Sequence, residues 1–341
     1  MSWQRVWGHE VHVKAFARIV QQGRLAHAYL FTGPAGIGKR LFALELAKTL
    51  LCEDRPPDQF QACDRCASCR LVDADNHPDL HITRRPEESL EVPIEVMREL
   101  CRNFSLKSAR GRGKIAILDD ADDLNEESAN CFLKTLEEPP PRSVLILIGT
   151  RADRQLPTIR SRCQAVPFTP LAPERVAAIL KAEGIEDSAL LERLVRMSDG
   201  SPGLARELAD PELWKFRNEF LSGLLRKPVD TVALSRAWLQ CVEEAGKEAA
   251  VQRRQAARVL MLLITFFRDA LALRLGGSPK AFSSDEMPAL REWVTKIDPE
   301  VLLAVLDRCL EADGQIDRRV QLVLVLEALV DALVRMKPAP I

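Results

Sequence analysis

The fold of this 341-residue chain is decided by one glycine-rich stretch, Gly33-Pro34-Ala35-Gly36-Ile37-Gly38-Lys39. An apolar run at residues 29–32 comes directly before it, and apolar residues at helical spacing follow it over residues 41–51. A G-x-x-x-x-G-K stretch between a strand and a helix is typical of a phosphate-binding loop, because its glycines let backbone N–H groups point at phosphate oxygens. The helix N-terminus and the lysine add positive charge there. Residues 33–40 are therefore predicted to form a nucleotide-binding loop.

The residues that would complete a hydrolytic site depart from the usual pattern. Arg40 stands where such loops carry the Ser or Thr that ligates Mg²⁺, and a cation cannot ligate a cation. Asp119 suits a metal-binding Walker-B carboxylate at a strand end, whereas Asp120 is one methylene shorter than the glutamate expected after it. Both acids could instead cap the following helix. The sequence makes Mg²⁺ binding doubtful and leaves open whether the loop binds ATP, ADP or nothing.

Continuous apolar runs mark the strands of the first half of the chain. Residues 29–32, 114–118 and 144–148 are such runs, each bounded by turn signals. This pattern is typical of strands that are buried on both faces. Because helical patterns alternate with these runs, the sequence predicts a parallel α/β sheet up to about residue 168.

The second half of the chain has a different pattern. After Pro170 the strand signal ends and amphipathic helical patterns follow to the C-terminus. Turn signals at residues 199–203 and 210–211 divide this half. The sequence therefore predicts an α/β domain, a small helical lid and an all-α domain, with the boundaries 1–170, 171–210 and 211–341.

A cluster of cysteines interrupts the first half, formed by Cys52, Cys63, Cys66 and Cys69. Four thiolates are the ligand set of structural zinc, so a Zn²⁺ module is predicted at about residues 52–80. A cubane iron–sulfur cluster is an alternative, but the usual motif has a further cysteine at the position that Asp73 occupies here. Metal-free or redox-active thiols are the other alternative.

Composition excludes several classes of protein. The chain has 48 Lys+Arg and 49 Asp+Glu residues, so no basic excess indicates nucleic-acid binding by the chain as a whole. It has no apolar run near the ~20 residues of a membrane span, and its N-terminus does not resemble a signal peptide, so we expect a cytoplasmic protein. A local basic run could face DNA or simply solvent; it comprises Arg98, Arg102, Lys107, Arg110, Arg112 and Lys114.

Further motifs lie at residues 6–9 (VWGH), 27–31 (HAYLF), 130–140 (NCFLKTLEEPP) and 156–163 (LPTIRSRC). Together with the phosphate loop and the cysteine module, they resemble the clamp-loader subunits of bacterial DNA polymerases, which are AAA+ proteins. The resemblance covers residues 1 to about 210. It implies a RecA-like AAA+ domain, a helical lid and a C-terminal helical collar.

The resemblance also implies roles for two residues outside the phosphate loop. Thr150 lies where the family has its sensor 1 residue. Arg162, in Ser-Arg-Cys, corresponds to an arginine finger that enters the ATP site of an adjacent subunit. The chain would thus complete a neighbour's site while its own is impaired.

The family contains motor subunits (gamma/tau) with intact catalytic motifs, and this chain departs from them. The resemblance places Gly203 where the motor subunits have a lid arginine. By the same resemblance, Arg40, Asp120 and Gly203 are each expected to affect hydrolysis and not the fold. The resemblance therefore implies a non-motor subunit of the holoenzyme with weak or no ATPase activity. Its implied partners are gamma/tau, delta, the sliding clamp and, through the complex, primer–template DNA. An active gamma/tau-like motor and an unrelated zinc-bearing NTPase are the alternatives.

Overall fold

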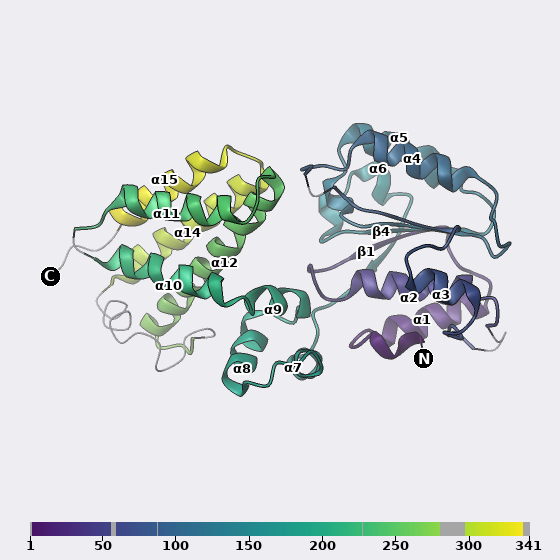
Figure 1. Ribbon diagram of the computed structural model, residues 1–341, viewed down its shortest axis with the longest axis horizontal. Helices are drawn as coiled ribbons and strands as arrows, with labels where there is room; N and C mark the ends of the chain where they lie inside the picture. Colours follow the sequence, from purple (N-terminus) through teal and green to yellow (C-terminus); the bar gives the residue numbers. More distant parts are fainter. Residues whose placement is uncertain (1, 56–58, 87, 227, 280–296, 337–341) are drawn as a thin grey trace. The chain divides into compact units, whose positions relative to one another are not determined.

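The computed structural model describes residues 2–55, 59–86, 88–226, 228–279 and 297–336 (Figure 1). The chain forms two compact units. The first unit comprises Met1–Glu186 with Ser198–Ala205, and the second unit comprises Asp187–Met197 with Arg206–Ile341. The predicted three-domain division stays a prediction, because compactness alone does not show which segments fold independently.

The first unit is built on a parallel five-stranded sheet. Its order is β2-β3-β4-β1-β5, with the bounds β1 (Ala28–Thr32), β2 (Leu80–Thr83), β3 (Lys114–Leu118), β4 (Ser143–Ile148) and β5 (Gln164–Pro167). The register places Leu30 beside Leu147 and Ile117 beside Ile146. Every residue of β1, β3 and β4 is buried, as continuous apolar runs require. The predicted α/β class is confirmed.

Helices cover both faces of this sheet (Figure 1). One face carries α1 (Glu10–Gln21), α2 (Lys39–Leu51) and α3 (Ala67–Asp73), and the other carries α4 (Ile94–Ser105), α5 (Glu126–Glu137) and α6 (Pro157–Arg160). The core under α4 and α5 contains Phe104, Phe132 and Leu145, each fully buried. The short helices η1 (Ser2–Arg5), η2 (Ala121–Asp123) and η3 (Ala152–Arg154) lie in connections, and α7 (Pro173–Ala182) follows the sheet.

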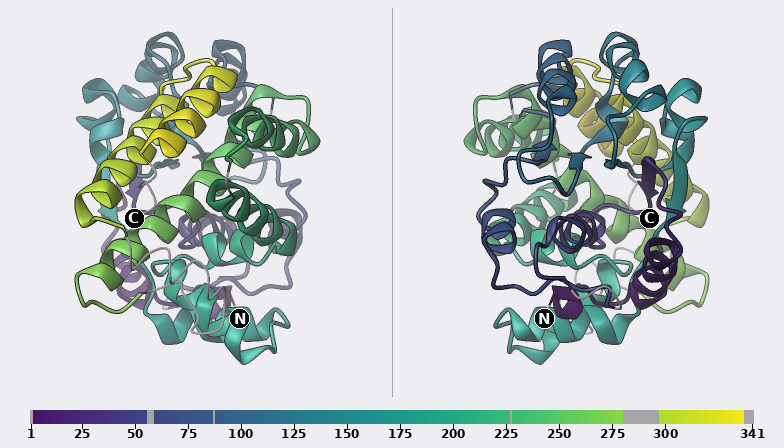
Figure 2. Two further views of the ribbon diagram at one scale, coloured as in Figure 1. Left: turned by 90° about the vertical axis from the view of Figure 1, so that its left-hand side faces the viewer. Right: turned by 90° about the vertical axis from the view of Figure 1, so that its right-hand side faces the viewer.

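The helices that follow are α8 (Ser188–Met197), α9 (Pro202–Leu208), α10 (Pro211–Leu225), α11 (Thr231–Glu244), α12 (Ala249–Arg274), α14 (Pro299–Asp317) and α15 (Leu322–Arg335). In the second unit α14 packs against α12 and α15, and α15 packs against α11 (Figure 2). Trp238, Phe266 and Leu329 are fully buried in this all-α region.

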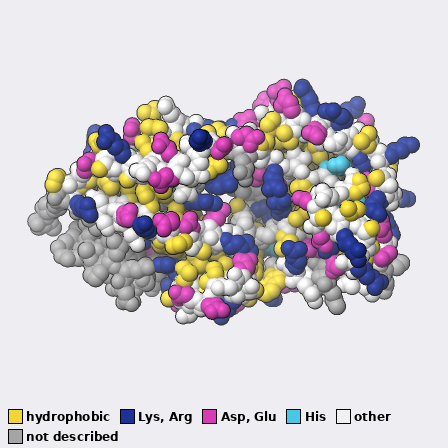
Figure 3. Space-filling view, in the orientation of Figure 1, with side chains coloured by type: hydrophobic (Ala, Val, Ile, Leu, Met, Phe, Trp, Pro, Cys, Tyr) yellow, Lys and Arg dark blue, Asp and Glu magenta, His cyan; other side chains and the backbone are white. Residues whose placement is uncertain are grey.

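Two surface properties agree with the composition. None of the helices in the described ranges is long and apolar enough to cross a membrane. On the face shown in Figure 3, acidic and basic side chains are interspersed, in keeping with the formal net charge of −1.

Candidate functional site

The phosphate loop connects β1 to α2, the position that the sequence predicts for it. Gly33, Gly36 and Gly38 have φ angles of 141°, 74° and 101°, a region that other residues rarely adopt. A Cβ on Gly33 would lie 2.3 Å from the carbonyl oxygen of Phe168. The loop therefore needs its glycines both for backbone conformation and for close packing.

Lys39 is held inside the loop that it follows. Its Nζ donates hydrogen bonds to the carbonyl oxygens of Gly33 at 2.5 Å and Pro34 at 2.6 Å. The residue is 6% exposed, and burial lowers the pKa of Lys39 to about 8, against the opposing charges of Asp122 and Asp119. A phosphate bound here would compete with these two carbonyl groups for the ammonium.

Arg40 lies beside the predicted Walker-B acid. Its Nε is 3.6 Å from Oδ2 of Asp119. Burial raises the pKa of Asp119, and the neighbouring charge of Asp120 raises it further, whereas Arg40 lowers it. Asp120 is exposed and has a φ of 56°. Thus the guanidinium occupies the neighbourhood in which a metal ion would meet Asp119.

Thr150 is bound by an acid that the sequence reasoning does not single out. Both the backbone N–H and the hydroxyl of Thr150 donate to Oδ2 of Asp122, each at 2.6 Å. The amide of Gln155 donates to Oδ1 of the same carboxylate at 2.5 Å. The spacing alone could not reveal this role, because Asp122 reaches Thr150 only through the turn of η2. Asp122 therefore connects the end of β3 to the end of β4.

His9 is a second residue that the sequence reasoning missed. It is 2% exposed, and its Nε2 donates to the carbonyl oxygen of Ile37 at 2.7 Å. Burial lowers the pKa of His9, so the neutral ring is favoured. The sequence signal that could have identified His9 is the Val-Trp-Gly-His motif at residues 6–9, of which it is the last residue. His9 supports the phosphate loop from its outer side.

Residues 198–205 belong to the first unit and pack against the phosphate loop. The hydroxyl of Ser201 donates to the carbonyl oxygen of Ala35 at 2.7 Å, and the N–H of Gly203 donates to that of Gly36 at 3.0 Å. A Cβ at Gly203 would lie 2.6 Å from the Cα of Gly36. Two backbones meet here, so this position has no room for a side chain.

Arg162 lies in the connection between α6 and β5. Its Nε donates to Oε1 of Glu137 at 2.8 Å, and a second guanidinium nitrogen donates to the carbonyl oxygen of Thr158 at 2.9 Å. The side chain is 33% exposed. These contacts hold the guanidinium at the surface, where an adjacent protein can reach it.

The four cysteines form one compact cluster in the first unit. Their Sγ atoms lie within 4.8 Å of one another, with 4.0 Å between Cys52 and Cys66 and 3.9 Å between Cys63 and Cys69. A tetrahedral zinc ion with bonds of about 2.3 Å holds its sulfur atoms about 3.8 Å apart. The donor set thus fits one Zn²⁺ ion, and four thiolates leave no open position for catalysis.

Hydrogen bonds favour the thiolate form of these cysteines, and burial opposes it. Backbone N–H groups of Cys63, Cys66 and Cys69 donate to cluster sulfur atoms at 3.3–3.4 Å. Burial raises the pKa of the Cys52 and Cys69 thiols. Burial also disfavours the Cys66 thiolate, but the N–H groups of Cys69 and Glu53 outweigh it and lower the pKa of Cys66 to about 7. A bound cation would offset the cost of burying several thiolates together.

Comparison with known proteins identifies the family. Residues 8–172 match the family model described as "DNA polymerase III, delta subunit". The delta-prime subunit of Yersinia pestis is 30% identical over 82% of this chain and 80% of that protein, and the one of Bacillus subtilis is 28% identical over 97% and 98%. The chain belongs to the delta-prime family of DNA polymerase III subunits. The structure of a gamma subunit-related protein from Thermotoga maritima aligns with 96% of this chain and 99% of its own length, with a TM-score of 0.46 and 18% identity.

Membership of the delta-prime family confirms the resemblance seen in the motifs. The sequence predicts that three residues separate this chain from a complete hydrolytic site: Arg40, Asp120 and Gly203. The structure places Arg40 beside Asp119 and Gly203 against the phosphate loop, and it leaves Asp120 exposed. The catalytic and nucleotide-binding roles assigned to these positions stay predictions.

Proposed function

We propose that this chain is the delta-prime subunit of a DNA polymerase III clamp loader, and that it completes the ATP site of a neighbouring subunit with Arg162. Family membership supports the first part. The position of Arg162 supports the second part, because its side chain is 33% exposed and, among the described residues, its guanidinium donates to Glu137, the carbonyl oxygen of Thr158 and the hydroxyl of Ser161. An exposed ion pair of this kind exchanges partners at little cost. An arginine supplied in trans accelerates phosphoryl transfer by roughly 10³–10⁵.

The chain's own phosphate loop is proposed to be a weak or inactive ATPase site. Lys39 is engaged by two loop carbonyls, and Arg40 lies next to Asp119. Thr150, the sensor 1 residue, donates its hydroxyl to Asp122. Residual ATP or ADP binding would not need Mg²⁺, because Arg40 itself offers positive charge. Titration with labelled nucleotide, with and without Mg²⁺, tests this point, and Mg²⁺-dependent binding would contradict it.

We propose that the protein acts in a hetero-oligomer with gamma/tau and delta subunits. In that assembly it would help to load the sliding clamp onto primer–template DNA, and it would meet DNA through the complex and not alone. Apolar side chains near the start of α15 remain exposed in this chain, among them Val323 at 41% and Leu324 at 56%. Helical surfaces of this kind commonly pack against other subunits.

The decisive experiment is an ATPase assay on the reconstituted loader. Arg162→Ala in this chain is expected to lower DNA-stimulated turnover by at least 10³-fold at the adjacent site, whereas Lys39→Ala leaves turnover near the wild-type rate. Arg160→Ala is the matched control, because Arg160 is an exposed arginine at the end of α6. If Lys39→Ala is the damaging change, the chain is a gamma/tau-like motor and the proposal is wrong.

A further inference from the structure

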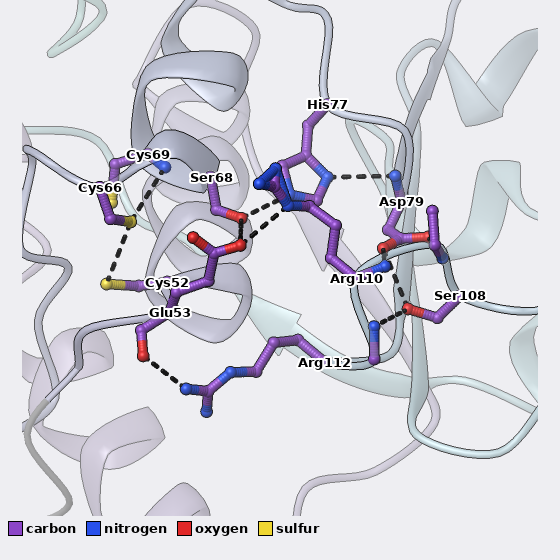
Figure 4. Close-up of polar contacts among 12 residues, drawn as sticks. Cys52, Glu53, Cys66, Ser68, Cys69, His77, Asp79, Ser108, Arg110 and Arg112 are labelled. Atoms are coloured by element: carbon purple, nitrogen blue, oxygen red, sulfur yellow. Dashed lines mark hydrogen bonds and ion pairs between the residues drawn. The ribbon is translucent and has the colours of Figure 1, made fainter.

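A polar network joins the cysteine cluster to residues 106–113, the turn that leads into β3 (Figure 4). Its centre is Glu53, which directly follows Cys52. The carboxylate of Glu53 accepts a hydrogen bond from Ser68 Oγ at 3.1 Å and an ion-paired one from Arg110 Nε at 2.8 Å. The carbonyl oxygen of Glu53 accepts from the guanidinium of Arg112 at 2.6 Å. One residue beside a metal ligand thus contacts two arginines of the turn.

The direction of the hydrogen bonds in this network is fixed by its geometry. The N–H of Asp79 donates to Nδ1 of His77 at 3.1 Å, so the proton of the neutral ring lies on Nε2. That Nε2 lies 3.0 Å from Oγ of Ser68 and donates to it, which leaves the Ser68 hydroxyl to donate to Glu53. Ser68 is itself between two cluster cysteines and is fully buried. The network therefore has one consistent set of donors and acceptors.

The far side of the turn is held by Asp79. This carboxylate is fully buried and accepts from the N–H groups of Ala109 at 2.7 Å and Arg110 at 2.9 Å. It also accepts from the hydroxyl of Ser108 at 2.9 Å. Glu53 thus binds the side chains of Arg110 and Arg112, whereas Asp79 binds two backbone N–H groups and the Ser108 hydroxyl of the same turn.

The network changes the interpretation of the basic run found in the sequence. Arg110 and Arg112 are directed at Glu53, and Lys114 is buried and donates to the carbonyl oxygen of Asn103 at 2.5 Å. Half of that run is therefore engaged inside the chain. In contrast, Arg98 is exposed on α4.

We propose that metal binding at the four cysteines and the ordering of residues 106–113 are coupled through Glu53, which acts as a positioning residue. The inference depends on the metal site but not on the arginine-finger proposal. A tetrathiolate zinc site carries a formal charge of −2, and Glu53 adds another negative charge, so two arginines nearby offset the excess. Metal binding also fixes the backbone at Cys52. Because Glu53 is the next residue, its carboxylate is thereby positioned for the ion pair with Arg110. Coupling of this kind is reciprocal: a loosened turn must weaken metal binding by the same factor.

Hydrogen–deuterium exchange of the full chain tests the coupling. In the zinc-loaded protein, the amides of residues 106–113 are expected to exchange at least tenfold more slowly than after chelation. Glu53→Ala keeps all four ligands, and it should give fast exchange of the turn even with zinc bound. Glu207→Ala, which removes a comparable ion pair with Arg258 in the second unit, should leave the turn unchanged. Equal exchange of the turn with and without metal, or absence of bound metal, overturns the proposal.

A second measurement tests the same coupling from the metal side, as a difference in zinc affinity between variants. Competition with a zinc chelator should show that Glu53→Ala and Arg110→Ala weaken zinc binding about fivefold or more. Arg98→Ala also removes one positive charge from the basic run, and it should leave the zinc affinity unchanged. If all three variants bind zinc with wild-type affinity, metal and turn are not coupled.

Discussion

The backbone N–H of Gly203 donates a hydrogen bond of 3.0 Å to the carbonyl oxygen of Gly36, so residues 198–205 pack directly against the phosphate loop. The Cα of Gly36 is 2.6 Å from the place that a Cβ on Gly203 would occupy. Real Cβ atoms do not approach backbone atoms so closely. Packing of the first unit therefore requires glycine at residue 203.

Gly203→Ala is expected to destabilise the chain by about 1–3 kcal/mol, because the added methyl group forces two backbones apart. Chemical denaturation monitored by circular dichroism measures this. Gly314→Ala is the matched control: it adds the same methyl group to a helix where the nearest atom is the flexible end of Arg318 at 3.5 Å. Gly314→Ala should raise the free energy of unfolding by about 0.5–1 kcal/mol, because alanine favours the helix over glycine. Equal effects of the two variants would contradict the close packing at Gly203.

The parts of the fold that follow from local pattern could be predicted from the sequence. The apolar run 114–118 coincides with β3, and the helical patterns expected after Pro170 correspond to helices such as α8 and α11. β5 was missed, because Gln164–Pro167 is short, largely exposed and lies at the edge of the sheet.

The site was predictable where the residues are close in sequence and not where the fold brings them together. The phosphate loop and the cysteine spacing are local motifs. The hydrogen bonds of Asp122 with Thr150 and of His9 with Ile37 join residues 28 positions apart. No periodicity or spacing encodes such contacts, since they depend on which strand ends lie side by side.

Lys39 should give the chain a specific pH dependence. Its folded pKa is lowered to about 8 by burial, whereas the unfolded lysine titrates near 10.5. Between these values the unfolded state binds more protons, so this residue makes stability rise with pH from about 8 to 10.5. Lys39→Met lacks that rise, and the wild-type minus variant free energy of unfolding should increase by up to about 1.4 kcal/mol per pH unit.

Urea denaturation at several pH values measures the Lys39 effect. The difference between two proteins isolates one residue from the other groups that titrate in this range. Lys181→Met, at an exposed position of α7, should give a flat difference over the same range. A flat difference for Lys39→Met as well would mean that Lys39 stays fully protonated when buried.

Arg162→Ala should change the stability of the isolated chain by less than about 1 kcal/mol, because both partners of its ion pair with Glu137 are substantially exposed. Thermal and urea denaturation measure this directly. A loss above about 2 kcal/mol would show that Arg162 has a structural role, and any effect on loader turnover would then need a different explanation. A small loss would leave catalysis in trans as the cause of reduced turnover.

Cys69→Ser should abolish binding of one zinc ion per chain and lower the stability of the first unit by several kcal/mol, since the binding energy of a structural zinc ion is folding energy. Metal analysis of the purified variant, together with its thermal denaturation, measures both effects.

Cys309→Ser is the control, because Cys309 is equally buried but lies in α14, outside the cluster. It should cost about 1–3 kcal/mol for burial of a hydroxyl and leave the zinc content at one. If Cys69→Ser retains a full equivalent of zinc, the cluster is not the metal site. Its thiols would then have to be explained by burial and hydrogen bonding alone.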